Sequence, residues 1–486
     1  MEDRSNMGQS ISELEPSEVF KFFDEITKIP RGSGNEKAIS DYLVDFANKR
    51  GLLAYQDECK NVTILKPGTP GMEDKDTVIL QAHMDMVCIA DKDAAVDPAK
   101  DPIDVYIDGD YIKARGTTLG ADDGIGMALI LAVLDSSNAA HPMIEAVFTA
   151  DEEVGLDGAN GYDCSRLKGK RFINLDSEEE YHLVIGCAGG CKCDISSKCK
   201  TGKVEGMIYE LEISGLTGGH SGVEIHKGNA NANSLMGWLL TEAMESVELN
   251  LGSYEGGIKD NAICAEASAT VVVKKKHAKT FEKIVKAFSD TVSTEYCSTD
   301  PDLTVVCRDK GKGKLEVMST KDFTKFATLL NILPHGVAKM SQIADMVEAS
   351  SNLAIVSAKP KNFKICESIR SNKEATLELM LRRVEMIADS FGVMHERRGW
   401  HPAWETDGVS DFARSAKQLY ETKFNRRIDI IAIHAGLECA VFSQKIKGLD
   451  AISIGPDMEG VHSPNEKLSI SSTKREWEFL KELLKL

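Results

Sequence analysis

The 486-residue sequence lacks any apolar run that approaches the roughly 20 residues needed to span a bilayer. Its N-terminus, MEDRSNMGQSISELEP, is polar and lacks an apolar stretch of the signal-peptide type. These absences exclude a membrane-spanning helix and argue against export. The cytoplasm is the expected compartment.

An excess of positive charge is also missing. The formal net charge is −18 at pH 7, which argues against nucleic acid or an anionic membrane surface as the main partner. An acidic balance does not by itself identify a substrate.

Cysteines are present, but without the spacing of a disulfide framework. The twelve are scattered, and several lie inside apolar segments, so we expect free thiols in a reducing compartment. One cluster, Cys187, Cys191, Cys193 and Cys199, leaves a zinc site open as an alternative. Its irregular spacings differ from the paired spacings of structural zinc sites and favour plain thiols.

The first part of the chain alternates strand-like and helix-like segments. Strands are expected in TVILQAHMDMV, MIEAVFTADEEVG and RFINLDSEE, and helices in PSEVFKFFDEITKI, NEKAISDYLVDFANKRG and GADDGIGMALILAVLDS. This order predicts βαβ units and an α/β domain with a mostly parallel central sheet.

The pattern changes near residue 188. MIYELEISG places Tyr209, Leu211 and Ile213 on one face, and similar half-exposed strands then alternate with helices. This indicates a separate α+β domain. Because a candidate ligand, His462, lies near the C-terminus, we expect a discontinuous catalytic domain of residues 1–187 and 400–486, with residues 188–399 inserted.

Histidine and carboxylate residues follow the predicted strands, where α/β proteins place their sites. His83 and Asp85 are two apart at a strand end and project the same way. A neutral imidazole can bind a metal while a carboxylate orients its other nitrogen. We therefore assign His83 as a ligand and Asp85 as its orienting partner.

The segment GADDGIG resembles a glycine loop that holds phosphate at a helix N-terminus. Two adjacent aspartates would repel a phosphate, although they could simply cap the helix. With His83 nearby, Asp122 is interpreted as a carboxylate that bridges two metal ions, and Asp123 as structural.

Glu152 and Glu153 are consecutive, so in an extended chain their side chains point in opposite directions. One of the pair can bind metal while the other acts as a general base. A solvated acidic turn, with Asp151 included, is the alternative.

Asp176 is a further strand-end carboxylate, and His462 lies on a loop that contains proline. Mixed histidine and carboxylate sites suit zinc, manganese or cobalt. The sequence therefore predicts two divalent ions held by two histidines and three carboxylates. Zinc is favoured, with Mn²⁺ and Co²⁺ as alternatives.

The full set of motifs resembles the zinc aminopeptidase/carboxypeptidase clan and, within it, the cytosol non-specific dipeptidases, also described as aminoacyl-histidine dipeptidases of the peptidase D type. The likeness covers nearly the whole chain and includes HMDMV, LGADDGIG, TADEEVGLDGA, INLDSEE, GLTGGHSGVEIHKGNANA, SSNLAIV, GWHPAW, HAGLECA and GVHSPNEKLSI. It implies a di-zinc exopeptidase-like domain with an inserted ferredoxin-like lid that also dimerises.

The resemblance also implies residue roles. The implied ligands are His83, Asp122, Glu153, Asp176 and His462. Glu152 would be the general base and Asp85 the orienting carboxylate. The lid residue His220 would stabilise the oxyanion, and Asn261, Arg370 and Gly436 would hold the substrate's backbone and carboxylate groups.

The expected reaction is hydrolysis of the peptide bond in dipeptides, of broad or Xaa-His type, by a bridging water that two metals activate and Glu152 deprotonates. Two alternatives stay open. Hydrolysis of another small amide, such as an N-acyl amino acid, would use the same metal residues. A non-catalytic protein on this scaffold would be expected to lack part of the set, which is complete here.

Overall fold

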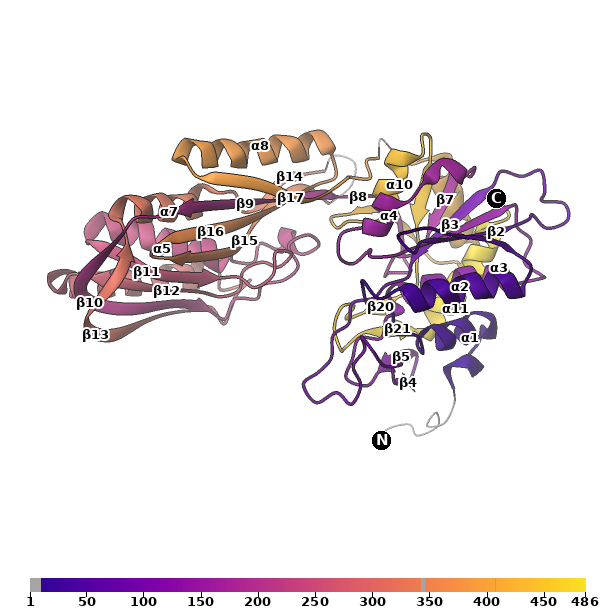
Figure 1. The fold of residues 1–486 in the computed structure, drawn as a ribbon, viewed down its shortest axis with the longest axis horizontal. Coiled ribbons are helices and arrows are strands. Elements are labelled where there is room, and N and C mark those ends of the chain that lie inside the picture. The colour runs from indigo at the N-terminus through magenta and orange to yellow at the C-terminus, as the bar shows by residue number, and fades with distance from the viewer. Residues whose placement is uncertain (1–9, 342–345, 407) are drawn as a thin grey trace. The chain divides into compact units, whose positions relative to one another are not determined.

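The structure, a computed structural model, describes residues 10–341, 346–406 and 408–486, so the first nine residues of the polar leader lie outside it. The chain forms two compact units (Figure 1). The first contains residues 1–187, 406–432 and 437–486, and the second contains residues 188–405 and 433–436. Each unit has its own core of buried apolar side chains.

The main sheet of the first unit has a parallel centre. Strands β6, β3, β7 and β19 run parallel, and β1, β2 and β8 join antiparallel at the flanks. In sheet order the strands are β1 (Leu53–Gln56), β2 (Val62–Lys66), β6 (Ile144–Thr149), β3 (Val78–His83), β7 (Arg171–Asn174), β19 (Asp450–Ser453), β8 (His182–Cys187) and β18 (Asp429–Ile433). This agrees with the α/β fold expected from the sequence.

Strands β3 and β6 are buried along their whole length, as expected for central strands covered on both faces. Their carboxyl ends meet at one edge, where His83 lies opposite Thr149. The helices of this unit are α1 (Ser17–Ile26), α2 (Lys37–Lys49), α3 (Ala121–Asp135), α4 (Asp157–Gly161), α9 (Asp411–Phe424), α10 (Cys439–Lys445) and α11 (Ile470–Leu483). Helix α3 is apolar on all sides because it packs against both β3 and α1.

A small antiparallel sheet was not expected from the sequence. It contains β20 (Met458–Glu459), β21 (Lys467–Ser469), β5 (Tyr111–Ala114) and β4 (Val105–Asp108). Its strands have two to four residues, which is too short for a periodic pattern to be recognised. The sheet anchors the loop between β20 and β21, which carries His462.

The second unit is built on an antiparallel sheet. Its strands, in order, are β13 (Thr304–Met318), β10 (Thr201–Ser214), β12 (Ala267–Val273), β11 (Leu249–Gly256), β15 (Val347–Lys359), β16 (Asn362–Ser371), β9 (Gly189–Lys198) and β17 (Met394–His401), with β14 (Gly336–Met340) paired to β15. The helices are α5 (Ala232–Ser246), α6 (Ala278–Glu295), α7 (Thr320–Ile332) and α8 (Glu374–Phe391). As expected, Tyr209, Leu211 and Ile213 of β10 are all buried.

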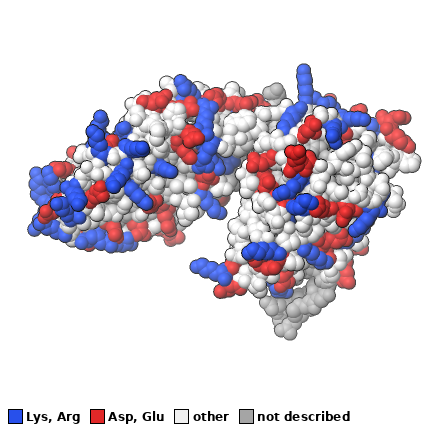
Figure 2. Space-filling model, viewed as in Figure 1, with Lys and Arg blue, Asp and Glu red and all other residues white. Residues whose placement is uncertain are grey.

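Strand β13 carries many polar residues and escaped sequence analysis. It pairs with β10 along nearly its whole length, and oppositely charged side chains link the two strands. Figure 2 shows basic side chains gathered at the lower left, over the end of the second unit where Figure 1 labels β10 and β13. Several pair with acids of β10: Lys312 with Glu205 at 2.6 Å, Lys310 with Glu210 at 2.6 Å, and Arg308 with Glu212.

The twelve cysteines all lie in described positions and all are free thiols, in agreement with the sequence-based expectation. Cys191 and Cys193 are both buried, and they lie on the same face of β9 because they are two residues apart. None of the four clustered cysteines belongs to a group of metal-donor atoms in the described residues. Every described helix is too short or too polar to cross a bilayer.

Candidate metal centre

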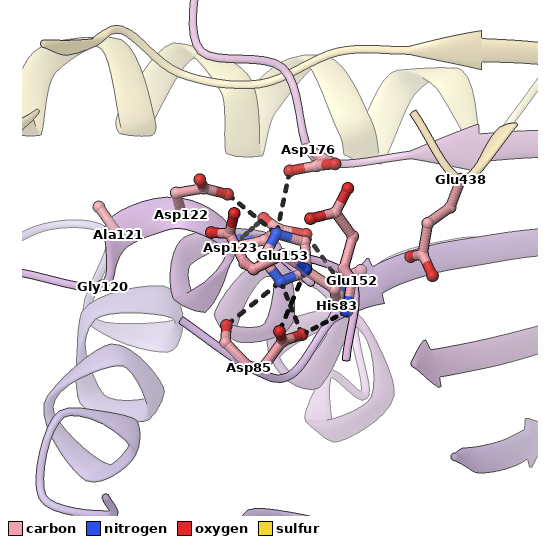
Figure 3. A network of polar contacts seen from close by, with 12 residues as sticks. His83, Asp85, Gly120, Ala121, Asp122, Asp123, Glu152, Glu153, Asp176 and Glu438 are labelled. Carbon is pink, nitrogen blue, oxygen red and sulfur yellow. Dashed lines mark hydrogen bonds and ion pairs between the residues drawn. The ribbon is translucent and has the colours of Figure 1, made fainter. Parts of the chain in front are cut away.

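His83 is the last residue of β3 and is almost completely buried. Its Nε2 atom lies 2.9 Å from Asp122 Oδ1 and 3.3 Å from Asp176 Oδ1. On the other side of the ring, Nδ1 lies 3.4 Å from Asp85 Oδ1 and 3.2 Å from the Asp85 carbonyl oxygen. Nε2 therefore faces the acidic cluster while Asp85 orients the ring (Figure 3).

Asp122 lies between two groups of possible ligands. Its Oδ1 faces His83, and its Oδ2 lies 3.0 Å from His462 Nε2. The same His462 nitrogen lies 2.9 Å from Glu153 Oε1. Asp122 thus offers one oxygen to each side, which is the arrangement that a bridging carboxylate requires.

The backbone that presents Asp122 is held by Glu466. One Glu466 oxygen accepts hydrogen bonds from the N–H groups of Leu119 and Gly120, and the other accepts from Ala121 and Asp122, at 2.7–3.4 Å. These groups at the start of α3 have no partner within the helix. Glu466 therefore supports the turn without pointing into the centre.

Arg31 is a second buried support. It donates to the carbonyl oxygens of Met84 and Asp85, at 2.8 and 2.7 Å, and to that of Gly120. It thus ties the end of β3 to the start of α3. Burial lowers the pKa of Arg31, while the surrounding carboxylates work in the opposite direction.

The acidic pair Glu152–Glu153 lies in a turn, so the expectation of an extended chain here was wrong. The Asp85 carboxylate accepts the backbone N–H of Glu152 at 3.0 Å and that of Glu153 at 3.2 Å, and thereby curls the segment. Glu153 contacts His462, whereas the Glu152 carboxylate forms no ion pair with a described residue. Asp85 thus positions the acidic pair as well as His83.

Asp123 has a structural position. Its Oδ2 accepts the His83 backbone N–H at 3.2 Å, and its Oδ1 accepts that of Gly126 at 3.1 Å. Asp123 does lie near His83 and Asp176 in one group of donor atoms. Because both of its oxygens already accept backbone hydrogen bonds, Asp122 is the better ligand of the two.

The crowded carboxylates alter one another's protonation. Burial, together with the charge of Asp122, raises the pKa of Asp176 to about 7. Burial also raises the pKa of Glu152 well above its ordinary value. Burial opposes the charge of His462, but Asp122 and Glu153 outweigh it and raise its pKa to about 11. The cluster therefore favours added positive charge.

The donor set fits divalent metal ions. The group of His83, Asp122 and Glu153 has its ligand atoms within 4.8 Å of one another, and so does the group of His83, Asp123 and Asp176. Imidazole and carboxylate donors together suit zinc and similar transition metals. The described residues thus supply ligands on both sides of Asp122.

The remaining predicted residues lie in the second unit. Ser221 donates its N–H to the Asn261 carbonyl at 2.8 Å, which places His220 and Asn261 on neighbouring segments. Arg370 lies on β16, and Gly436 lies against the ring of His401. The His220 Nδ1 atom accepts the N–H groups of Gly222 and Val223 at 3.2 and 3.1 Å, so its neutral ring carries the proton on Nε2.

Sequence reasoning missed Arg31, Glu466 and Glu438. Glu438 is buried behind the centre, where it accepts from Gln81 at 2.5 Å and from Thr149 at 2.6 Å. These residues lie outside the strand-end motifs. Signals were available for two of them, because Glu438 lies in HAGLECA and Glu466 follows His462 by four positions in GVHSPNEKLSI.

Comparison with known proteins supports the resemblance expected from the motifs. Residues 79–486 match the sequence profile of Peptidase family M20/M25/M40. The cytosol non-specific dipeptidase of Escherichia coli (strain K12) is 37% identical over 478 residues, which cover 98% of each chain.

Solved structures show the same relationship. The aminoacylhistidine dipeptidase of Vibrio alginolyticus matches over 98% of each chain, with 35% identity and a TM-score of 0.86. The aminopeptidase PepT of Bacillus cereus, at 16% identity and a TM-score of 0.55 over 97% of this chain and 98% of that one, shares the fold. With its matched region covering most of its length, the chain belongs to Peptidase family M20/M25/M40.

Proposed function

We propose that this protein is a dipeptidase that hydrolyses the peptide bond of dipeptides, of broad or Xaa-His specificity, with two divalent metal ions. The observation that carries the proposal is the position of Asp122, which offers one oxygen toward His83 and the other toward His462. The similarity to two dipeptidases over nearly the whole chain supports the substrate class.

Five residues would hold the ions, with Asp122 shared between them: His83, Asp122, Glu153, Asp176 and His462. Zinc is the favoured metal because the donors mix imidazole and carboxylate, and Mn²⁺ or Co²⁺ would also fit. Bound divalent ions supply a water of lowered pKa and positive charge for the carbonyl oxygen. Asp85 would keep the His83 ring in its binding orientation.

Glu152 would act as the general base. It would take a proton from the attacking water and later give it to the leaving amine. Two features support this role: the Glu152 carboxylate has no ion-pair partner among the described residues, and burial raises its pKa well above the ordinary value of a glutamate. Glu153, which contacts His462, is the better ligand.

Residues of the second unit would complete substrate binding. His220, with its proton on Nε2, would donate to the developing oxyanion. Asn261 and Gly436 would bind the substrate's backbone, and Arg370 its carboxylate. We further propose that residues 188–399 serve as a lid and dimerisation domain of a cytoplasmic homodimer whose partners include neither nucleic acid nor membrane.

The direct test is metal analysis of the purified chain together with a substrate panel. We expect two divalent ions per chain and hydrolysis of dipeptides that a chelator abolishes and zinc restores. Activity on N-acyl amino acids with none on dipeptides would replace the substrate assignment. Absence of both activities from the metal-loaded chain would overturn the proposed function.

Replacing Glu152 with Gln tests the base. The amide cannot accept the proton, so kcat should fall by a factor of about 10²–10⁴ while both metals stay bound. Glu179→Gln is the matched control, because Glu179 is an exposed glutamate of the same unit that pairs with His182. Normal turnover of the Glu152→Gln variant would disprove the assignment.

A further inference from the structure

Arg370 of β16 is a largely buried cation without a counter-ion. Its Nε atom has no hydrogen-bond partner, and the side chain forms no ion pair with any described residue. Asp260 is the carboxylate whose charge acts on Arg370. That carboxylate already pairs with Lys192 at 2.7 Å and with Arg398 at 3.2 Å. A buried charge without a partner is costly, so the position favours an anionic ligand.

The strand register places a histidine beside this arginine. Ser350, Arg370, Gly190 and His401 form one row across strands β15, β16, β9 and β17. Directly opposite residues lie on the same face of a sheet. A Cβ atom at Gly190 would lie 2.6 Å from His401 Nε2. The imidazole therefore covers Gly190 and extends toward Arg370.

One nitrogen of the His401 ring forms no hydrogen bond with a described residue. This atom, Nδ1, is buried. Burial and then the charge of Arg370 lower the pKa of His401 to about 4, against a raising effect of the Pro402 carbonyl. The ring is therefore neutral at pH 7 and has one N–H to donate.

The other side of Arg370 is already filled. His434 bonds through Nε2 to Ser350 Oγ at 2.7 Å and through Nδ1 to Asn372 Oδ1 at 3.1 Å. Because both ring nitrogens already form hydrogen bonds, neither nitrogen of His434 is left to bind a ligand at Arg370. Near His401, Gly436 leaves room for the imidazole ring, since a Cβ at that position would lie 3.2 Å from His401 Cε1.

We propose that His401 is a substrate-binding residue that, together with Arg370, holds the free C-terminal carboxylate of the substrate. The Arg370 guanidinium would donate two parallel hydrogen bonds to the carboxylate, and His401 would donate one more. Gly190 is required because any side chain there would displace the imidazole. This inference rests on the proposed dipeptidase function and adds to it a residue that selects substrates with a free carboxylate.

The test compares one dipeptide with its C-terminal amide, using the metal-loaded chain. His401→Phe keeps a ring but removes the N–H, and we expect KM for the dipeptide to rise about 10-fold or more while kcat/KM for the amide changes less than about twofold. Gly190→Ala should produce the same selective loss, because its methyl group displaces the ring. His395→Phe, on the same strand, is the control and should behave as the unaltered chain.

A binding measurement separates this inference from the proposed function. Calorimetry of the metal-free full chain would compare N-acetyl-L-alanine with N-acetyl-L-alanine amide. We expect the unaltered chain to prefer the carboxylate, and both His401→Phe and Gly190→Ala to lose that preference. Carboxylate preference without dipeptide hydrolysis would overturn the proposed dipeptidase function but would support the carboxylate site at Arg370 and His401. Equal losses on dipeptide and amide in both variants would overturn the role of His401.

Discussion

At the scale of single residues, the acids of the metal centre fall into two kinds. Asp85, Asp123 and Glu466 use their oxygens to accept backbone N–H groups. Asp122 and Glu153 instead face the histidines. The sequence indicated the strand-end acids because each follows an apolar run. It could not indicate what Glu466 binds, because its partner Leu119 lies 347 positions away in the chain.

Glu466 gives a prediction at this scale. Glu466→Gln replaces a carboxylate that accepts four N–H groups, so the turn that presents Asp122 should loosen. Supporting residues of this kind commonly contribute 10–100-fold to metal affinity, and we expect a loss of about that size. Metal titration followed by calorimetry would measure it.

The matched control is Glu459→Gln, an exposed acid of the same C-terminal segment that pairs with Lys467. It should bind metal as the unaltered chain does. Equal affinity of the Glu466→Gln variant and this control would contradict the supporting role.

At the scale of elements, the sequence predicted the long helices well because each repeats apolar residues at helical spacing. Helix α11 extends over Ile470–Leu483, where apolar residues recur at this spacing. The pattern did not reveal that its Glu476 is buried. Burial, then the charges of Glu180 and Asp457, raise the pKa of Glu476 to about 8.

This burial predicts a pH dependence of stability. Between an unfolded pKa of about 4.3 and the folded value of about 8, Glu476 is protonated when folded and ionised when unfolded. The native state then binds more protons, so its stability falls as pH rises through this window. Glu476→Gln should therefore gain stability relative to the unaltered chain, by roughly 1.4 kcal/mol per pH unit.

Urea unfolding at pH 5.5 and pH 8, with saturating metal, would measure the difference. Glu478→Gln, a more exposed acid of the same helix that pairs with Lys481, is the control. Parallel pH profiles for the unaltered chain and the Glu476→Gln variant would argue against a neutral Glu476.

At the scale of the whole molecule, the proposed metal ligands and the proposed substrate-binding residues belong to different compact units. The five candidate ligands all lie in the first unit, although 379 positions separate His83 from His462 (462 − 83 = 379). The second unit interrupts the chain between them and has its own apolar core.

Metal removal should therefore act on one unit. Ligand binding stabilises the native state by about 4 kcal/mol at a thousandfold excess over Kd, and chelation removes this contribution. We expect faster hydrogen exchange in peptides that contain His83, Asp122, Glu153, Asp176 and His462, and unchanged exchange within residues 201–332. Mass spectrometry of the full chain with and without chelator measures this, and uniform acceleration in both units would refute it.

The sequence by itself determined the apolar central strands and the long helices, and that histidines and acids follow those strands, because these signals are local and periodic. Tertiary structure decided which acids face the histidines and which accept backbone hydrogen bonds. It also decided that Glu153 rather than Glu152 contacts His462, and that His401 covers Gly190 beside Arg370. These outcomes depend on contacts between residues far apart in the chain, and such contacts leave no local pattern to read.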